Sequence, residues 1–247
     1  MQLMAPWVPS FVQAVSRQLE TSPFVTFSFA TVDSTGAPKV RTCIYRGFLF
    51  DDKKTNILTF TTDVRMEKWE HVDHNSKFEA CFWFPQSNVQ FRLSGHATGL
   101  RFDSLDSVNE KLGDYPLVSP QFIKQYSSHT DLDAIAHQQI NGNGPQRPTV
   151  AEWEQELESK WTSLSTKLKS SFRKPEPGSK ITEEKQKLLD SISRGVDGSH
   201  EEDGKKNFSL VMLLVDKVDF VDLNGHQSRY LYERYDKDQW SEDDVCP

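Results

Sequence analysis

The sequence predicts an α+β fold that is mostly β, in which one antiparallel barrel carries inserted helices. From about residue 24 to residue 100, runs rich in Phe, Val, Ile and Thr alternate with short turn signals, as is typical of an antiparallel meander. Strand-like runs return near the C-terminus, and a helical stretch lies between the two groups. We therefore expect a single domain over residues 1–247, with a helical insertion at about residues 101–205.

The first hundred residues predict two helices and five strands. Apolar residues recur near helical spacing from Pro6 to Glu20, and a short helix is expected from Val64 to Val72. The strands are expected at Phe24 to Asp33, Lys39 to Phe50, Ile57 to Thr62, Phe78 to Phe84 and Val89 to Leu100.

The sequence after residue 100 predicts a helical stretch followed by three strands. Helices are expected at Ser104 to Leu112, Pro120 to Gln125 and Thr149 to Ser170, with a loop at Ile140 to Pro148. The polar, acidic, glycine-containing run at residues 195–206 predicts a mobile surface loop. The last strands are expected at Ser209 to Val215, Asp219 to Leu223 and Gln227 to Arg234.

Composition excludes several classes of function. The formal charge is -7, and no basic block appears, so we expect no nucleic-acid partner. No apolar run approaches the length of about 18 residues that a membrane span needs, so we expect no membrane partner. The first twenty residues lack the basic head, apolar core and cleavage site of a secretory signal.

Cysteine and histidine positions give no sign of a disulfide framework or a metal site. Cys43, Cys81 and Cys246 are scattered and odd in number, which favours a reducing compartment and a cytoplasmic location. His71 and His74 are three apart, but no further ligands group with them, so no metal is predicted. The chain also lacks G-x-G-x-x-G, P-loop and G-x-S-x-G motifs.

Charge is distributed unevenly along the chain. Residues 39–68 carry seven basic and four acidic side chains, so this segment is at +3 while the rest of the chain is at -10. Arg41 and Arg46 lie five apart on one predicted strand and would point to opposite faces, unless a bulge intervenes. A positive segment in an acidic protein indicates an anion pocket.

A phosphate site is one interpretation of the end of this segment. Thr61 and Thr62 end a predicted strand, and Arg65 and Lys68 lie in the first turns of the helix that follows. Hydroxyls, free N–H groups at a helix N-terminus and two cations together can hold a phosphate. In the alternative interpretation, Thr62 or Asp63 caps the helix while the two cations face water. The residues by themselves leave both open.

Gln90 also has two interpretations. It shares the polar face of its predicted strand with Arg92 and Ser94, while Val89, Phe91 and Leu93 share the other face. Gln90 and Arg92 can be an ordinary solvated pair, which the pattern favours, or the Gln90 amide can contact the edge of a heteroaromatic ring.

Several segments, in this order, resemble the pyridoxamine 5'-phosphate oxidase-like FMN-binding proteins. The subfamily that they resemble most pairs R-T-x-x-x-R-G-F with T-D-x-R-S-x-K and Q-F-R-x-x-G. The segments are RTCIYRGF at residues 41–48, FTTDVRMEK at 60–68, WFP at 83–85, VQFRLSG at 89–95 and, later, SFRKPEPG at 171–178.

The resemblance implies a split β-barrel that binds FMN at a homodimer interface. Arg41 and Lys68 would hold the phosphate, Arg65 would add to them, and Thr61 and Thr62 would donate hydrogen bonds. Arg46 and Gln90 would lie near the flavin ring, with Gln90 supplied by either subunit. The other positions that the resemblance assigns to the cofactor are Thr42, Ile44, Met66, Ser171 and Arg229.

The chain also departs from the family pattern. Met66 stands where the subfamily usually has Ser, and Arg46 stands where the oxidases have Lys. The run from Val221 to Arg229 keeps the final Arg but lacks the oxidases' R-x-H-D-R, so we expect a substrate other than pyridoxamine phosphate. The resemblance favours an FMN-dependent oxidoreductase of unknown substrate, with its catalytic residues unassigned. The alternative is a non-catalytic flavin-binding or dimeric interaction protein.

Overall fold

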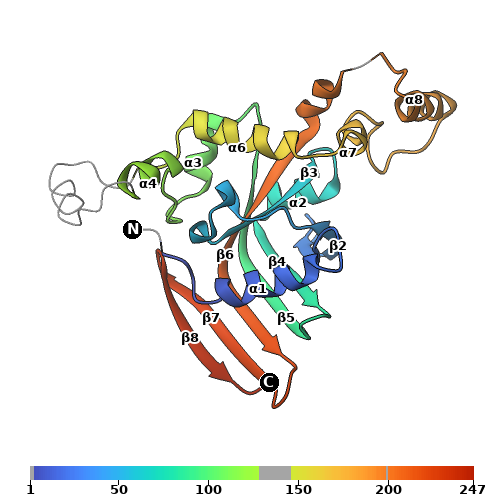
Figure 1. The fold of residues 1–247 in the computed structure, drawn as a ribbon. Coiled ribbons are helices and arrows are strands. Elements are labelled where there is room, and N and C mark those ends of the chain that lie inside the picture. The colour runs from blue at the N-terminus through green and yellow to red at the C-terminus, as the bar shows by residue number, and fades with distance from the viewer. Residues whose placement is uncertain (1–2, 128–145, 199) are drawn as a thin grey trace.

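The computed structural model describes residues 3–127, 146–198 and 200–247. It confirms the predicted α+β fold: eight strands form one antiparallel sheet with several helices, as in a split barrel, and the sheet is not closed (Figure 1). Most of the predicted loop at Ile140 to Pro148 and part of the predicted insertion lie outside the described residues. The interpretation of residues 1–247 as one domain stays a prediction.

The strands follow the order β2-β1-β4-β5-β6-β7-β8, and β3 pairs with β6 beside this path. The strands are β1 (Thr26–Val32), β2 (Pro38–Ile44), β3 (Ile57–Asp63), β4 (Lys77–Phe84), β5 (Val89–Leu100), β6 (Phe208–Asp222), β7 (Ser228–Asp236) and β8 (Gln239–Val245).

Strand β6 joins the two ends of the chain. It pairs with β5 along most of its length, and on its other edge it pairs first with β3 and then with β7. The segment after β2 also approaches β3, because the Arg46 N–H donates to the Thr59 carbonyl at 2.8 Å and Phe48 forms a bridge with Leu58. This pairing brings the end of β2 beside β3.

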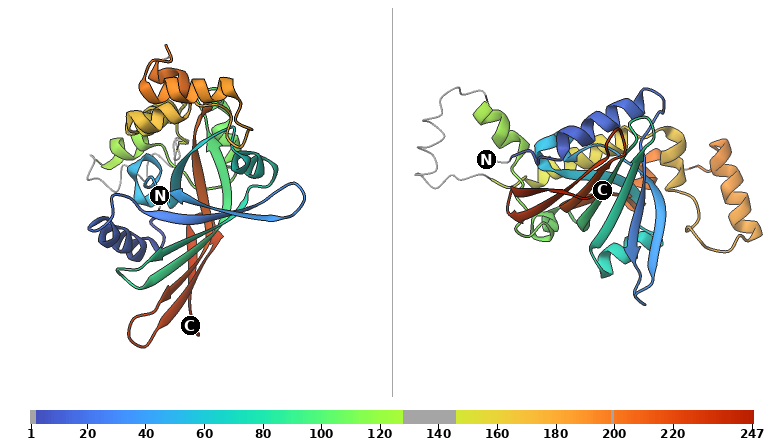
Figure 2. Two further views of the ribbon diagram at one scale, coloured as in Figure 1. Left: turned by 90° about the vertical axis from the view of Figure 1, so that its right-hand side faces the viewer. Right: turned by 90° about the horizontal axis from the view of Figure 1, so that it is seen from below.

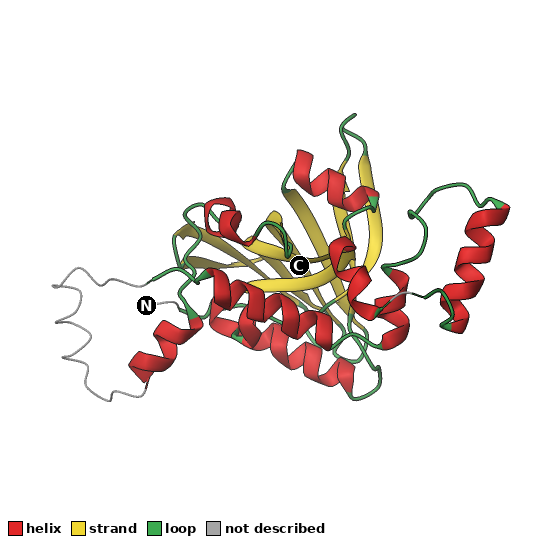
Figure 3. Ribbon diagram, turned by 90° about the horizontal axis from the view of Figure 1, so that it is seen from above, coloured by secondary structure: helices red, strands yellow, loops and turns green. Residues whose placement is uncertain are grey.

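The helices lie on both sides of the sheet and at one end of it (Figures 1 and 2). They are α1 (Val8–Leu19), α2 (Glu67–His74), α3 (Val108–Lys111), α4 (Pro120–Ser127), α6 (Val150–Thr162), α7 (Thr166–Ser171) and α8 (Glu183–Arg194). Seen from above, α8 stands apart from the strands at the end of a loop (Figure 3). No helix among the described residues is long and apolar enough to cross a membrane.

Two hydrophobic clusters hold these layers together. In the first, the fully buried Phe11 of α1 packs edge-on against Phe82 and Phe91 of the sheet, with ring centroids 5.0 and 5.3 Å apart. The second lies under α6, where Trp161 packs against Phe208 at 5.2 Å. Alternate residues of β6 serve the two clusters, because successive side chains of a strand point to opposite faces.

Three predicted boundaries were wrong. The long helix expected to end at Ser170 breaks into α6 and α7, because the Ser165 hydroxyl accepts a hydrogen bond from the Leu168 N–H and caps a new helix. The strand expected to reach Phe50 ends at Ile44, so Arg46 lies beyond it. The two strands expected after Ser209 are one strand, β6.

One strand and one α-helix were not predicted. Strand β8 has the sequence QWSEDDV, which is too acidic to signal a strand, and within the described residues it pairs with β7 alone, at the edge of the sheet. Helix α8 was also missed, although the Thr182 hydroxyl caps it and Gly195 ends it in a left-handed conformation. In the segment predicted to be mobile, Glu201–Asn207 forms a 3-10 helix, and its mobility stays a prediction.

A bulge interrupts the pairing of β5 with β6. Ser94 pairs with Lys217 and Gly95 with Val215, so Asp216 is an extra residue on β6. A Cβ atom at Gly95 would lie 2.1 Å from the Leu214 carbonyl oxygen and 2.9 Å from the Asp216 nitrogen. Both neighbours are backbone atoms of the paired strand, so the bulge requires glycine here.

We therefore expect Gly95→Ala to lower the free energy of unfolding by about 3 kcal/mol, because the backbone on both strands must shift. Urea unfolding measures this loss. Gly36→Ala is the control, because the added Cβ would meet nothing within 4 Å. Its free energy of unfolding should fall by about 1 kcal/mol, since alanine is strained at the φ of +85°. Equal losses in the two variants would contradict the role of Gly95.

Candidate functional site

Most of the predicted site residues surround one cavity. It has a volume of about 490 Å³ and lies between the ends of β2 and β3, the start of α2, and the segment from α7 to α8. The predicted residues that line it are Thr42, Ile44, Arg46, Thr61, Thr62, Met66, Lys68 and Ser171. Arg41, Arg65, Gln90 and Arg229 are not among its lining residues.

Lys68 brings a positive charge to the cavity. Its Nζ donates to the Thr62 hydroxyl at 3.1 Å and contacts the Met66 Sδ. Burial lowers the pKa of Lys68 from its ordinary value, although the Asp63 carboxylate acts in the opposite direction. Lys68 forms no ion pair within the described part of the chain. An anion in the cavity would supply the missing counter-charge.

Arg46 is a second cation of this kind. It borders the main cavity and also a smaller hollow of about 210 Å³ beside Ser159 and Lys160. Its Nε is buried and has no hydrogen-bond partner among the described residues. Burial lowers the pKa of Arg46. A buried guanidinium N–H without a partner is costly, so this atom is free to donate to water or to a ligand in the cavity.

The start of α2 is open to the same cavity. The N-cap residue is Met66, whose side chain makes no capping hydrogen bond in the described structure. The predicted caps, Thr62 and Asp63, were therefore wrong, because the helix begins at Glu67, several residues later than expected. A helix N-terminus without a side-chain cap leaves backbone N–H groups for an anion.

The Arg65 guanidinium is bonded to other groups of the protein. It precedes α2, and its Nε and Nη2 donate to the two carboxylate oxygens of Asp63 at 2.9 and 2.6 Å. Hydrogen bonds to that carboxylate raise the pKa of Arg65. Its Nη1 donates to the Lys174 carbonyl at 2.8 Å, and Nη2 also reaches the Phe172 carbonyl. Arg65 thus ties the end of β3 to the segment that forms the opposite wall of the cavity.

Arg41 is also held by neighbouring groups, next to the cavity. Its Nη1 donates to the Thr31 hydroxyl at 2.7 Å, and also to the carbonyls of Phe29 and Lys39. Its Nη2 lies 3.3 Å from the Nδ1 of His71, a buried side chain of α2. Because Arg carries only donors, a hydrogen bond between these two groups requires Nδ1 to accept.

Gln90 and Arg229 lie on the outer face of the sheet. In the order of the sheet, Gln90 on β5 lies three strands from β2 and Arg229 on β7 lies five strands from it, while β6 separates both strands from β3. Arg229 donates to Asp219 at 2.8 and 3.0 Å, and Arg92 donates to the same carboxylate. The Gln90 Oε1 accepts a hydrogen bond from the Cys81 thiol at 3.6 Å. One chain does not bring these two residues to the cavity.

On one wall of the cavity, Ser171 is the one residue that the sequence analysis assigned to the site. It is formed by the Pro175-Glu176-Pro177 turn, the exposed Ile181, and Lys185 and Leu189 of α8. The two prolines signalled the turn, and the Thr182 cap could have signalled the helix. The cavity offers Arg46 and Lys68, which form no ion pair among the described residues, near an open helix N-terminus, and it has apolar side chains on the opposite wall. It suits an anion attached to an apolar or planar group.

Comparison with known protein families agrees with this chemistry. Residues 4–100 match the family model described as "Pyridoxamine 5'-phosphate oxidase, FMN-binding domain". The uncharacterized protein YGR017W of Saccharomyces cerevisiae is 36% identical over 295 aligned residues, which cover 99% of each chain. The pyridoxine/pyridoxamine 5'-phosphate oxidase 2 of Arabidopsis thaliana is 28% identical over 106 residues, 43% of this chain and 50% of that one.

Solved structures share the fold. A pyridoxamine 5'-phosphate oxidase-related, FMN-binding protein from Nostoc punctiforme has a TM-score of 0.69 at 24% identity, over 100% of both chains. PhzG from Burkholderia lata, solved with tetrahydrophenazine-1-carboxylic acid, has a TM-score of 0.59 at 14% identity, over 100% of this chain and 99% of that one. The chain belongs to the same family as yeast YGR017W, and its residues 4–100 match the pyridoxamine 5'-phosphate oxidase FMN-binding domain model.

Proposed function

We propose that this protein binds FMN in the cavity between β2, β3 and α2 and acts as an FMN-dependent oxidoreductase. The observation that carries the proposal is the pair of uncompensated cations, Arg46 and Lys68, beside the uncapped start of α2. A phosphate would supply the counter-charge, and the match of residues 4–100 to an FMN-binding domain supports FMN as the phosphate-bearing ligand.

The residues around the cavity fit this cofactor. Lys68, the Thr62 hydroxyl and the N–H groups at the start of α2 would hold the phosphate. Arg46, with its buried unpartnered Nε, would donate to a polar atom of the flavin. Arg41 would orient Lys68 and α2 through His71. Arg65 would act on the cofactor indirectly, by holding the wall that carries Phe172 and Lys174.

Bound FMN would supply the hydride and electron transfer chemistry. The chain's own groups bind and orient. Of the two carboxylates lining the cavity, Asp63 is paired with Arg65, and Glu176 belongs to the Pro-Glu-Pro turn. The Cys43 thiol also lines the cavity, and burial raises its pKa to about 11, so it remains protonated. Positioning of the flavin therefore dominates over acid and base catalysis by side chains.

A homodimer would explain the positions of Gln90 and Arg229. Both lie on the outer face of the sheet, and neither lines the cavity of its own chain. That face carries Trp83, which is 46% exposed, and Val40, which is 70% exposed. A second copy placed on this face would bring its Gln90 and Arg229 toward the cavity. One flavin would then contact residues of both subunits.

The substrate that we propose is not pyridoxamine phosphate. The run from Val221 to Arg229 ends β6, turns, and begins β7 without the substrate-binding R-x-H-D-R of the oxidases. Three cysteines without a disulfide support a cytoplasmic location.

The function is tested by spectroscopy of the purified chain. We expect one FMN per chain, with visible flavin absorbance that bleaches under NADPH or NADH without oxygen and recovers when an electron acceptor is added. Flavin that binds but never bleaches would favour a non-catalytic flavin-binding protein. Failure of the chain to bind FMN at all would overturn the proposal.

Riboflavin, which lacks the phosphate, separates the roles of Lys68 and Arg65. Lys68→Gln should weaken FMN binding about 10- to 100-fold, as expected for the loss of a charge-assisted hydrogen bond, and leave riboflavin binding unchanged. Arg65→Gln should weaken both ligands by a similar factor, because it releases a wall rather than a phosphate contact. Isothermal titration with each ligand measures both effects.

Limited trypsin digestion provides an independent readout for Arg65. Cleavage after Lys180 and Lys185, in the wall segment, should become faster in Arg65→Gln and stay unchanged in Lys68→Gln. Arg65→Lys is a weaker substitute, because it cannot donate to Asp63 and two carbonyls at once. Loss of FMN but not riboflavin in Arg65→Gln would make Arg65 a phosphate ligand instead.

The dimer is tested on its proposed interface. Trp83→Glu places a charge on the outer face of β4, and we expect monomers in sedimentation and loss of bound FMN, although Trp83 does not line its own chain's cavity. Val196→Glu is the control, because Val196 is 65% exposed and lies outside the sheet. A monomeric wild-type chain that binds FMN fully would refute the shared site.

A further inference from the structure

The opposite wall of the main cavity, from Leu168 to Leu189, carries cations of its own. Lys174 and Lys185 line the cavity there, and their ammonium groups form no ion pair within the described residues. Glu176 is the one carboxylate that this wall presents among the described lining residues, and its charge also acts on Arg65. The wall therefore has one positive charge in excess.

The charge of the whole cavity leaves room for a second anion beside a phosphate. Its lining cations are Arg46, Lys68, Lys174 and Lys185. Of its two carboxylates, Asp63 is neutralised by Arg65, so Glu176 alone opposes the four cations and three positive charges remain. A phosphate monoester carries about -1.5 to -2 at neutral pH, so a bound FMN phosphate would leave at least one positive charge. One further carboxylate would complete the balance.

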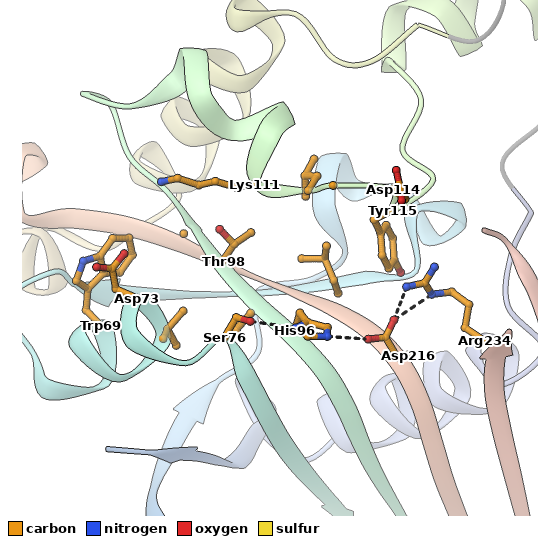
Figure 4. Close-up of a pocket in the computed structure, with 16 residues that line it drawn as sticks. Trp69, Asp73, Ser76, His96, Thr98, Lys111, Asp114, Tyr115, Asp216 and Arg234 are labelled. Carbon is orange, nitrogen blue, oxygen red and sulfur yellow. Dashed lines mark hydrogen bonds and ion pairs between the residues drawn. The ribbon is translucent and has the colours of Figure 1, made fainter. Parts of the chain in front are cut away.

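The second cavity that α2 borders has no such excess. It has a volume of about 430 Å³ and lies between α2, β5, β6 and the residues that follow α3 (Figure 4). Besides His96, the charged groups at this cavity are three cations and three carboxylates: Lys111, Arg147, Arg234, Asp73, Asp114 and Asp216. These charges balance, so the surplus of positive charge is a property of the main cavity.

Lys185 stands on the apolar face of α8. Leu188, Leu189 and Ile192 follow it at intervals of three, four and seven residues, which is the spacing of one helix face. Leu189 lines the main cavity together with Lys185, and Ile192 is buried. Lys185 therefore occupies a position at which the pattern predicts an apolar residue, and its charge is turned toward the cavity.

The helix dipole also disfavours a cation at this position. Lys185 is the third residue of α8, and its N–H donates to the capping hydroxyl of Thr182 at 3.3 Å. A Glu at this position would complete a capping box and complement the dipole, as Glu183 and Glu184 do before it. Neither of these glutamates lines the cavity. The stability of α8 thus does not explain Lys185, whereas an anion in the cavity does.

Apolar side chains surround Lys185 on the same wall. Ile181 lines the cavity four residues before it and is 70% exposed, and Leu189 lines the cavity four residues after it. Pro175 and Pro177 extend this apolar lining along the turn. A ligand that packs against these side chains would remove apolar surface from water. The wall therefore suits an anion that carries an apolar body.

We propose that the substrate of the flavin site is an organic acid with an apolar body. Its carboxylate would bind Lys185, with Lys174 adding positive charge on the same wall, and its apolar part would pack against Ile181 and Leu189. The inference rests on the proposed function only in naming this acid the substrate. The acid site itself is built from residues of the opposite wall, which are not the residues proposed to hold the phosphate.

Two ligands that share a ring and differ in one charge test the proposal. We expect fluorine NMR to show that 4-(trifluoromethyl)benzoate binds the FMN-loaded chain at least about tenfold more tightly than 4-(trifluoromethyl)benzamide. The acid should leave FMN bound, because the two anions would occupy opposite walls. If the acid binds no better than the amide, or if it displaces FMN as it binds, the proposal is wrong.

Variants of α8 assign the binding to Lys185. Lys185→Gln should weaken binding of the acid about tenfold and leave binding of the amide unchanged, and Lys185→Arg should restore most of the loss. Lys187→Gln is the matched control, because it removes the same charge from the same helix at an exposed position outside the lining. Unchanged affinity for the acid in Lys185→Gln, or an equal loss in Lys187→Gln, would overturn the assignment.

The same titration of the chain without FMN separates this inference from the proposed function. A chain that never binds FMN but holds the acid through Lys185 would refute the flavin site and support the acid site. A chain that binds FMN but does not prefer the acid over the amide would refute the acid site and leave the flavin site standing.

Discussion

The structure depends on one strand, β6, which is shared by two hydrophobic cores. Val211 and Leu213 face the aromatic cluster under α1, while Leu210 and Met212 between them face the cluster under α6. On its edges, β6 satisfies the backbone groups of β5, β3 and β7. Any change in its register would move residues from one core to the other and separate both ends of the chain. The bulge at Asp216 is the one place where this register shifts, and glycine at position 95 permits it.

Helix α2 borders two cavities. Its first turn and the end of β3 present Lys68 and uncapped N–H groups to one of them, which favours an anion. Trp69 and Asp73 line the other cavity. The helix has only eight residues, so both cavities depend on how this short segment is anchored. The buried His71, held by Thr31 and Arg41, provides part of that anchor.

The cations of this segment differ in role because of their partners. Arg65 is neutralised by Asp63 and bonded to two carbonyls, and Arg41 is held by a hydroxyl, carbonyls and an imidazole. Arg46 and Lys68 keep unsatisfied charge, and burial lowers the pKa of both. A buried charge without a counter-ion is costly, so these two residues are the ones whose energy a bound phosphate would lower most.

The sequence by itself determined the strand pattern, the α+β class, the concentration of positive charge and the lining residues Thr61, Thr62 and Lys68. These properties are local: alternation of apolar residues and runs of charge can be recognised within a few residues. Only the tertiary structure decided that Arg65 meets carbonyls more than a hundred residues away, that α8 contributes to a cavity wall, and that Gln90 and Arg229 do not line the cavity of their own chain. The acidic strand β8 and the single strand β6 were missed for the same reason. Pairing with β7 stabilises β8, and pairing with β3, β5 and β7 carries β6 through the polar residues at the bulge, against their local preference. Contacts between residues distant in sequence decide which charge is satisfied and which is left for a ligand, and no local pattern records them.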